Sequence, residues 1–170
     1  MNYWLLKCEP DDDYSYSDLE KDGKTVWDGV SNNWALTFIR KVKKGDKVFI
    51  YHTGNQRCVA GIANVVSDPY PDPNENNEKL AVFDITPNHS LKKPVTLKQI
   101  KEDSRFNEFH LVKFSRLSVM PVEKEYWDMH RVSIFVYMTA RGGYYKELYR
   151  HALNNEITFK DIFLEIKNNP

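Results

Sequence analysis

The alternation of apolar and polar positions along residues 1–129 predicts several short strands interrupted by short helices. Strands are expected over Tyr3–Lys7, Lys47–His52, Cys58–Val66 and Leu80–Thr86, and within Leu117–Val122. Helical spacing or capping residues predict helices over Tyr16–Lys21, Asn32–Val42, Pro94–Lys101 and Glu123–Met129. The strands neither alternate regularly with long helices nor pair only as hairpins. The pattern therefore favours an α+β fold with a small, strongly bent, barrel-like sheet over a doubly wound parallel sheet.

The character of the chain changes after His130. Val132–Met138 is apolar and aromatic, Tyr144–Leu153 has a helical pattern, and Thr158 is placed to cap a last helix. This region is too apolar for a disordered tail. We therefore expect residues 1–129 to form one domain, and residues 130–170 to form a C-terminal helical extension that packs on this domain or on a second subunit.

Composition narrows the class of protein. The chain has 170 residues, a size typical of one domain with an appendage. Its 24 basic and 24 acidic residues give a net charge of zero, which argues against a protein that coats nucleic acid through bulk electrostatics. Cys8 and Cys58 have no metal-site spacing, and two isolated thiols without a signal-peptide pattern predict a cytoplasmic protein. No stretch reaches the roughly 18 apolar residues of a membrane span.

The stretch Trp27–Asn32 combines a large flat ring, an Asp-Gly turn and a side-chain amide. A flat ring stacks on a planar ligand, and an amide offers a donor and an acceptor to the edge of a base. Trp27 and Asn32 therefore point to a nucleobase pocket. The same residues also fit a core tryptophan beside an ordinary turn, and an asparagine that caps a helix.

Several segments, in order, resemble motifs of the EVE domain family, which belongs to the PUA-like superfamily and is related to YTH and ASCH domains. The matching segments are Tyr3–Pro10, Tyr16–Leu19, Trp27–Asn32, Lys44–Asp46 with Phe49–His52, Val59–Ala63 with Tyr70–Asp72, and Leu111–Val112 with Ser115–Val122. The resemblance implies a PUA-like bent pseudo-barrel, a pocket for a nucleobase that is often modified, and no catalysis. The chain has Cys8 where the family has Ser, and Ser31 where it has Arg. The second change removes a possible guanidinium contact to a phosphate or base.

The residues and the resemblance together predict a pocket in which Trp27 stacks on the base and Asn32 reads its edge. Strand ends and the turn after Trp27 supply the other expected pocket residues, which are Lys7, Cys8, Glu9, Gly29, Val30, Tyr51, His52, Arg116 and Ser118. Alternation along the late strand is expected to place Arg116 and Ser118 on one face. The expected partner is DNA or RNA with a modified base, and neither metal nor cofactor is expected.

A basic cluster follows the pocket segment and consists of Arg40, Lys41, Lys43 and Lys44. It is expected either to contact phosphates beside the bound base or to be only a solvated helix end.

Two other functions fit parts of the sequence. A nucleotide-acting hydrolase would use His52 with Glu9 or Asp28, but the chain lacks a nucleophile elbow, a P-loop, a metal constellation and a Rossmann glycine motif. A reactive-thiol role for Cys8 would need a lowered pKa. An oligomeric interaction subunit would assemble through the aromatic extension and have a degenerate pocket. The leading prediction is a non-enzymatic nucleic-acid-binding module.

Overall fold

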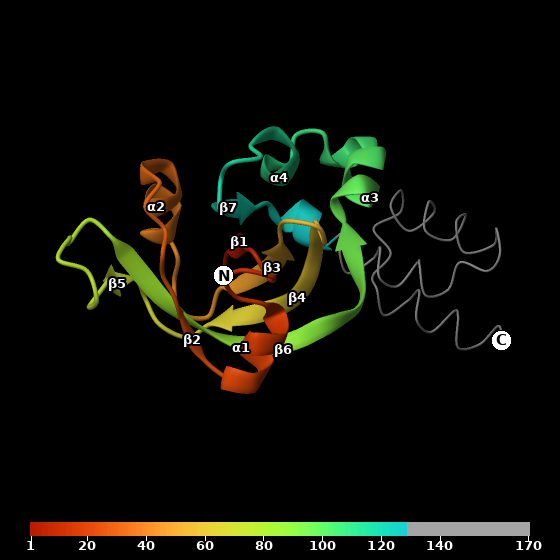
Figure 1. The fold of residues 1–170 in the computed structure, drawn as a ribbon. Coiled ribbons are helices and arrows are strands. Elements are labelled where there is room, and N and C mark those ends of the chain that lie inside the picture. The colour runs from red at the N-terminus through yellow and green to blue at the C-terminus, as the bar shows by residue number, and fades with distance from the viewer. Residues whose placement is uncertain (129–170) are drawn as a thin grey trace. The chain divides into compact units, whose positions relative to one another are not determined.

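The structure of the chain is a computed structural model that describes residues 1–128 (Figure 1). Within this range the chain has the predicted α+β fold, in which short helices connect the strands of one curled sheet. The predicted helices and packing of residues 130–170 lie outside the described residues and stay predictions.

The sheet has seven strands. Its order is β2 (Thr25–Trp27), β6 (Ala81–Thr96), β4 (Cys58–Val65), β3 (Lys47–His52), β1 (Tyr3–Cys8) and β7 (Val119–Val122), and β5 (Tyr70–Pro71) pairs with β6 outside this path. β1 and β3 are parallel, and the other pairings are antiparallel. In Figure 1, β6 runs across the domain and then turns upward, which gives the sheet its bend.

Strand β3 has the predicted bounds. Strands β1 and β4 are also confirmed, and each differs from its prediction by one residue at one end. The prediction for β6 is too short, because this strand continues beyond Thr86 to Thr96. The register between β4 and β6 shifts at two irregularities in the pairing, and such bulges interrupt the period of two that reveals a strand. β2 was not predicted, because three residues are too few to show a period.

Four α-helices and one 3-10 helix lie between the strands of the described chain: α1 (Tyr16–Asp22), α2 (Asn33–Ile39), α3 (Leu97–Glu102), α4 (His110–Lys113) and η1 (Ser104–Phe106). A capping box of Ser15 with Asp18 begins α1, and Gly23 ends it at a φ of +70°, as the sequence predicts. α2 ends at Ile39 rather than Val42, so the basic cluster follows this helix instead of extending it. α4 was not predicted.

Asp46, the last residue of the Lys44–Asp46 motif, contributes to the fold. The buried Asp46 carboxylate accepts hydrogen bonds from the Asn2 N–H at 2.6 Å, the Trp4 Nε1–H at 2.9 Å and the Lys43 N–H at 3.0 Å. A buried carboxylate is tolerated when donors surround it in this way. Asp46 therefore fastens the start of β1 to the start of β3.

Candidate functional site

The carboxyl ends of the parallel strands β1 and β3 bring two predicted site segments together. Lys7 pairs with Tyr51, and Cys8 pairs with His52. The Thr53 N–H donates to the Cys8 carbonyl oxygen at 2.8 Å, and the Thr53 hydroxyl oxygen lies 3.1 Å from the same atom. The structure therefore places these two segments side by side, and their closeness to Trp27 stays a prediction.

Lys7 is the point where several parts of the chain meet. Its backbone N–H donates to the Ser118 carbonyl oxygen at 2.9 Å, and its Nζ donates to the Ser115 carbonyl oxygen at 2.9 Å. The Nζ also lies 6.0 Å from the centroid of the Tyr51 ring. Desolvation lowers the pKa of Lys7 to about 8. A partly desolvated ammonium group gains from an added acceptor or anion, so Lys7 is chemically suited to hold one.

The residues predicted to precede the late strand lie in a turn between α4 and β7. β7 begins at Val119, so strand alternation does not apply to Arg116 and Ser118, and the prediction that it places them on one face is wrong. The turn reaches Lys7 through backbone carbonyl groups. Arg116 is exposed, and no hydrogen bond or ion pair engages its guanidinium within the described residues.

Asn32 caps α2. Its Oδ1 accepts from the backbone N–H groups of Trp34 at 2.9 Å and Ala35 at 3.1 Å. These two bonds use both acceptor positions of the amide oxygen. The capping interpretation is confirmed, and the side chain can offer a ligand only the two N–H donors of Nδ2.

Trp27 ends β2, where it pairs with Phe83 of β6, and it is 7% exposed. Such low exposure fits the alternative of a core tryptophan, and stacking on this ring stays a prediction. Gly29 adopts a φ of +70° in the turn that follows, which explains the glycine there. Val30 is half-buried in the same turn.

Ring contacts connect the start of α2 to the turn that holds Lys7. Trp34 and Phe114 meet edge to face, with centroids 4.8 Å apart. Phe114 directly precedes Ser115, whose carbonyl oxygen accepts from the Lys7 Nζ. We name this neighbourhood the β1-end site and define it as Lys7, Cys8, Asn32, Tyr51 and Ser115–Ser118.

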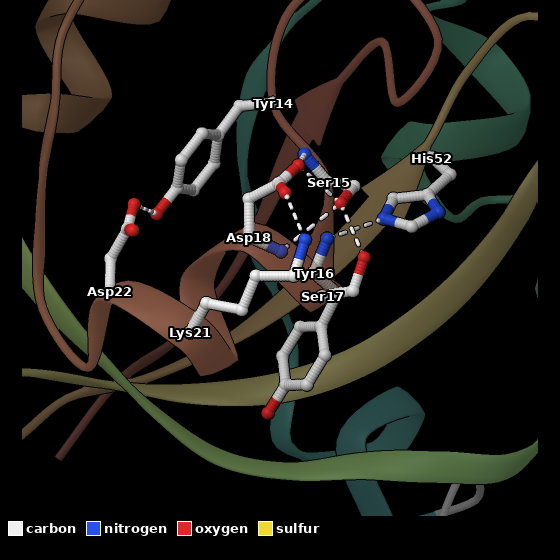
Figure 2. Close-up of polar contacts among 8 residues, drawn as sticks. All are labelled: Tyr14, Ser15, Tyr16, Ser17, Asp18, Lys21, Asp22 and His52. Carbon is white, nitrogen blue, oxygen red and sulfur yellow. Dashed lines mark hydrogen bonds and ion pairs between the residues drawn. The ribbon is translucent and has the colours of Figure 1, made fainter.

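His52 holds α1 in place. Its Nε2 accepts from the Tyr16 N–H at 2.9 Å, as Figure 2 shows. Its Nδ1 lies 2.7 Å from the Gln56 Oε1. Because Nε2 accepts, Nδ1 carries the hydrogen and donates to Gln56. Both ring nitrogens are engaged in a buried side chain, so the prediction that His52 binds a base is not supported by this geometry.

Tyr16 extends this anchoring of α1 to β4. Its hydroxyl donates to the Ile62 carbonyl oxygen at 2.7 Å, and its ring passes so close to Gly61 that a Cβ there would lie 2.3 Å from it. Gly61 therefore provides the space for α1 to pack on the sheet. The resemblance included Gly61, and packing explains it.

Glu9 is similarly engaged in the fold. Thr53 Oγ1 donates to its Oε2 at 2.7 Å, and a Cβ on Gly54 would lie 2.3 Å from its Oε1. The carboxylate thus packs on the turn after β3. Both His52 nitrogens and one Glu9 carboxylate oxygen are already hydrogen-bonded, which argues against a catalytic pairing of His52 with Glu9. The alternative pairing of His52 with Asp28 stays untested.

The basic cluster lies at the end of α2 opposite Asn32. All four side chains are in exposed residues, the Arg40 Nη2 donates to the Lys79 carbonyl oxygen at 2.5 Å, and the Lys41 Nζ lies 5.8 Å from the Phe38 ring centroid. A helix of seven residues is about 10 Å long. The cluster is therefore separated from Asn32 of the β1-end site by about the length of α2. Contact of its four side chains with phosphates beside the base stays a prediction.

A hollow of about 450 Å³ lies by the amino end of β1. It is lined by Met1, Asn2, Tyr3, Trp4, Lys41, Pro121, Val122, Glu123 and Lys124. Of the residues predicted for the site, only Lys41 lines it. Across the described part of the chain, no three His, Cys, Asp or Glu side chains are grouped to hold a metal ion, and in residues 1–128 no helix has the length and apolar character needed to cross a bilayer.

Sequence reasoning missed the exposure of Trp34. The predictions from sequence did not single out this residue, yet 44% of it is exposed, whereas Ala35, Leu36 and Ile39 of the same helix are buried. These three residues already form a complete apolar stripe, and Trp34 lies beside it. The position of Trp34 beside this stripe is the feature of the sequence that could have indicated its exposure.

The family model of the EVE domain matches residues 2–130. Thymocyte nuclear protein 1 of Rattus norvegicus is 29% identical over 163 residues, which cover 75% of this chain and 71% of that protein. A Pseudomonas syringae protein of known structure has 36% sequence identity and a TM-score of 0.72. The match covers 78% of this chain and 99% of the Pseudomonas chain. Human THYN1 protein, solved in complex with DNA that contains 5-methylcytosine, is 26% identical and has a TM-score of 0.72. The match covers 79% of this chain and 98% of the human chain.

An ASCH protein of Zymomonas mobilis is 12% identical with a TM-score of 0.50, a likeness of fold alone that covers 78% of this chain and 98% of the other. It agrees with the PUA-like architecture expected from the resemblance. The match to the family model spans the whole of the described sheet and its helices. The chain belongs to the EVE domain family.

Proposed function

We propose that this chain is a non-enzymatic module that binds nucleic acid carrying a modified base, and that it holds this base at the β1-end site. The observation that carries the proposal is the convergence on Lys7 of segments far apart in sequence: the end of β1, Tyr51 of β3, the turn Ser115–Ser118 and, through Phe114, the start of α2. Motifs of the family lie in each of these segments. The complex of human THYN1 with 5-methylcytosine DNA makes that base the first ligand to test.

The site offers complementary chemistry for one extruded base. The ammonium group of Lys7 and the Nδ2 of Asn32 are donors for base or phosphate oxygens, and exposed Arg116 adds a cation. Extruding a base costs a few kcal/mol and costs least for an unpaired one. Trp27 remains our proposed stacking ring, and its 7% exposure implies that an entering base uncovers it.

Selectivity for the modification is expected to be moderate. One added methyl group in a pocket contributes about 1–3 kcal/mol, which corresponds to tens to hundreds of fold in affinity. RNA of the same sequence should be tested as well, because the donors of Lys7 and Asn32 do not distinguish ribose from deoxyribose.

Because the charge of Lys7 changes with pH, the proposal can be tested by measuring ligand affinity at different pH values. With a pKa of about 8, the amine is mostly protonated at pH 7 and mostly neutral at pH 9. If the cation contacts the ligand, affinity for a 5-methylcytosine oligonucleotide should fall about tenfold between these pH values. Lys7→Gln should bind more weakly at pH 7 and change little at pH 9, as measured by fluorescence anisotropy.

Lys98 provides the matched control. It lies on α3 with its side chain 85% exposed, so Lys98→Gln removes the same charge outside the β1-end site and should bind as the wild type does. Equal affinity of Lys7→Gln and the wild type at pH 7 would contradict the proposed role of Lys7.

A further inference from the structure

Trp34 is a large ring on the first turn of α2 that the core does not cover. It is 44% exposed, although Ala35 and Leu36 beside it are buried. Phe38 follows one turn later on the same helix face, 5.9 Å from Trp34 between centroids, and the Lys41 Nζ lies over the Phe38 ring. A row of two rings and a cation thus runs along the outer side of α2.

Neighbouring rings fix the orientation of Trp34. Phe114 meets it edge to face at 77°, and Phe38 packs against it at 42°. Phe38 in turn contacts the His110 ring at 6.3 Å. A ring held in place on one side and open on the other can accept a flat partner without first losing conformational freedom.

Cationic residues of the described chain lie near both ends of this row of rings, although none is in contact with Trp34 itself. Phe114 leads directly into the turn that contains Arg116 and binds Lys7, and Lys41 lies at the far end of the row. Two carboxylates of the same region are engaged: Glu108 accepts from Lys113 at 2.6 Å, and Glu123 lies 3.6 Å from His110. Exposed rings flanked by cations are typical of surfaces that bind a single nucleic-acid strand.

We propose that Trp34 stacks on the base adjacent to the one held at the β1-end site, so that the chain takes two consecutive nucleotides and needs the adjacent base to be unpaired. This inference rests on the proposed function. A protein partner could also use an exposed tryptophan, but Lys41 at the Phe38 ring and exposed Arg116 in the turn after Phe114 favour a strand that carries phosphates.

Two ligands test the inference. One is a trinucleotide with a central 5-methylcytosine, and the other has the same centre but abasic sugars on both sides. Trp34→Ala should weaken binding of the first ligand by roughly 5- to 100-fold and leave binding of the second unchanged. Trp34→Phe should retain most of the affinity, because it keeps a ring at that position.

Val26→Ala is the control, because Val26 is also an exposed large apolar residue but lies on β2. It should not change the affinity for either ligand. Thermal unfolding followed by circular dichroism checks that each variant is folded.

The outcomes separate this inference from the proposed function. If the wild type binds both ligands and Trp34→Ala binds them equally well, or loses both to the same extent, the adjacent-base role is overturned while the proposed function stands. If the wild type binds neither ligand, both fail. A change of oligomeric state in Trp34→Ala, seen by light scattering, would assign the ring to a second copy of the chain and overturn the inference.

Discussion

The Cys8 thiol occupies the end of β1, buried and 3.8 Å from the Tyr51 carbonyl oxygen. Desolvation raises its pKa to about 12, and the negative charges of Asp13 and Glu9 act in the same direction. Desolvation also raises the pKa of Cys58. Because the thiolate is the nucleophile, these surroundings argue against a reactive-thiol role for Cys8.

We expect the native protein to react only slowly with the thiol reagent DTNB at pH 7.5, and the denatured protein to show both of its 2 cysteines. The folded-state pKa of Cys8 lies above the ordinary value of 9.0. The folded protein therefore holds its proton more tightly, and this contribution to stability is lost as the pH rises from about 9 to about 12. Rapid reaction of one thiol in the native protein would show that Cys8 or Cys58 is not buried as described.

At the scale of elements, α2 positions two residues of interest, Asn32 and Trp34, and the sequence pointed only to the first. Its N-cap uses the oxygen of Asn32, and its first turn presents Trp34 to Phe114. Capping uses the amide oxygen, and the proposed binding role would use the Nδ2 donors of the same amide. Substitutions that keep or remove the capping oxygen of Asn32 can test the two roles separately.

Asn32→Asp and Asn32→Ala make that separation. Aspartate is as good an N-cap as asparagine, so the free energy of unfolding should stay within about 0.5 kcal/mol, whereas alanine should cost about 0.5–2 kcal/mol. Aspartate also replaces the Nδ2 donor with a negative oxygen, so its affinity for the 5-methylcytosine oligonucleotide should fall severalfold. Chemical denaturation and anisotropy measure the two effects, and unchanged affinity of Asn32→Asp would limit Asn32 to capping.

Periodicity predicts the elements whose faces differ clearly and misses those whose pattern is interrupted. β3 lies between two strands and shows a buried run, so its bounds follow from the sequence. The outer half of β6 does not, because exposed Asn88, His89 and Ser90 and irregular pairing with β4 remove the alternation. Trp27 and Trp34 show the same limit for a site, since the turn and the amide that follow Trp27 directed the prediction to the buried ring rather than to the exposed one.

At the scale of the whole molecule, the candidate site depends on contacts that no local pattern encodes. The bond between the Lys7 Nζ and the Ser115 carbonyl oxygen joins residues 108 positions apart. Only the ordered family motifs indicated that these segments belong together, and they could not show that His52 and Glu9 would be engaged in the fold. The cytoplasmic location, the division at residue 129 and assembly through residues 130–170 stay predictions.

The most direct test of the proposed function is a backbone amide chemical-shift titration of the isotopically labelled chain with a short oligonucleotide that contains one 5-methylcytosine. We predict the largest shifts at Lys7, Cys8, Tyr51 and Ser115–Ser118, with smaller or no shifts for the unmodified oligonucleotide. Shifts confined to the hollow lined by Met1–Trp4 and Val122–Lys124, or no shifts at all, would contradict binding at the β1-end site.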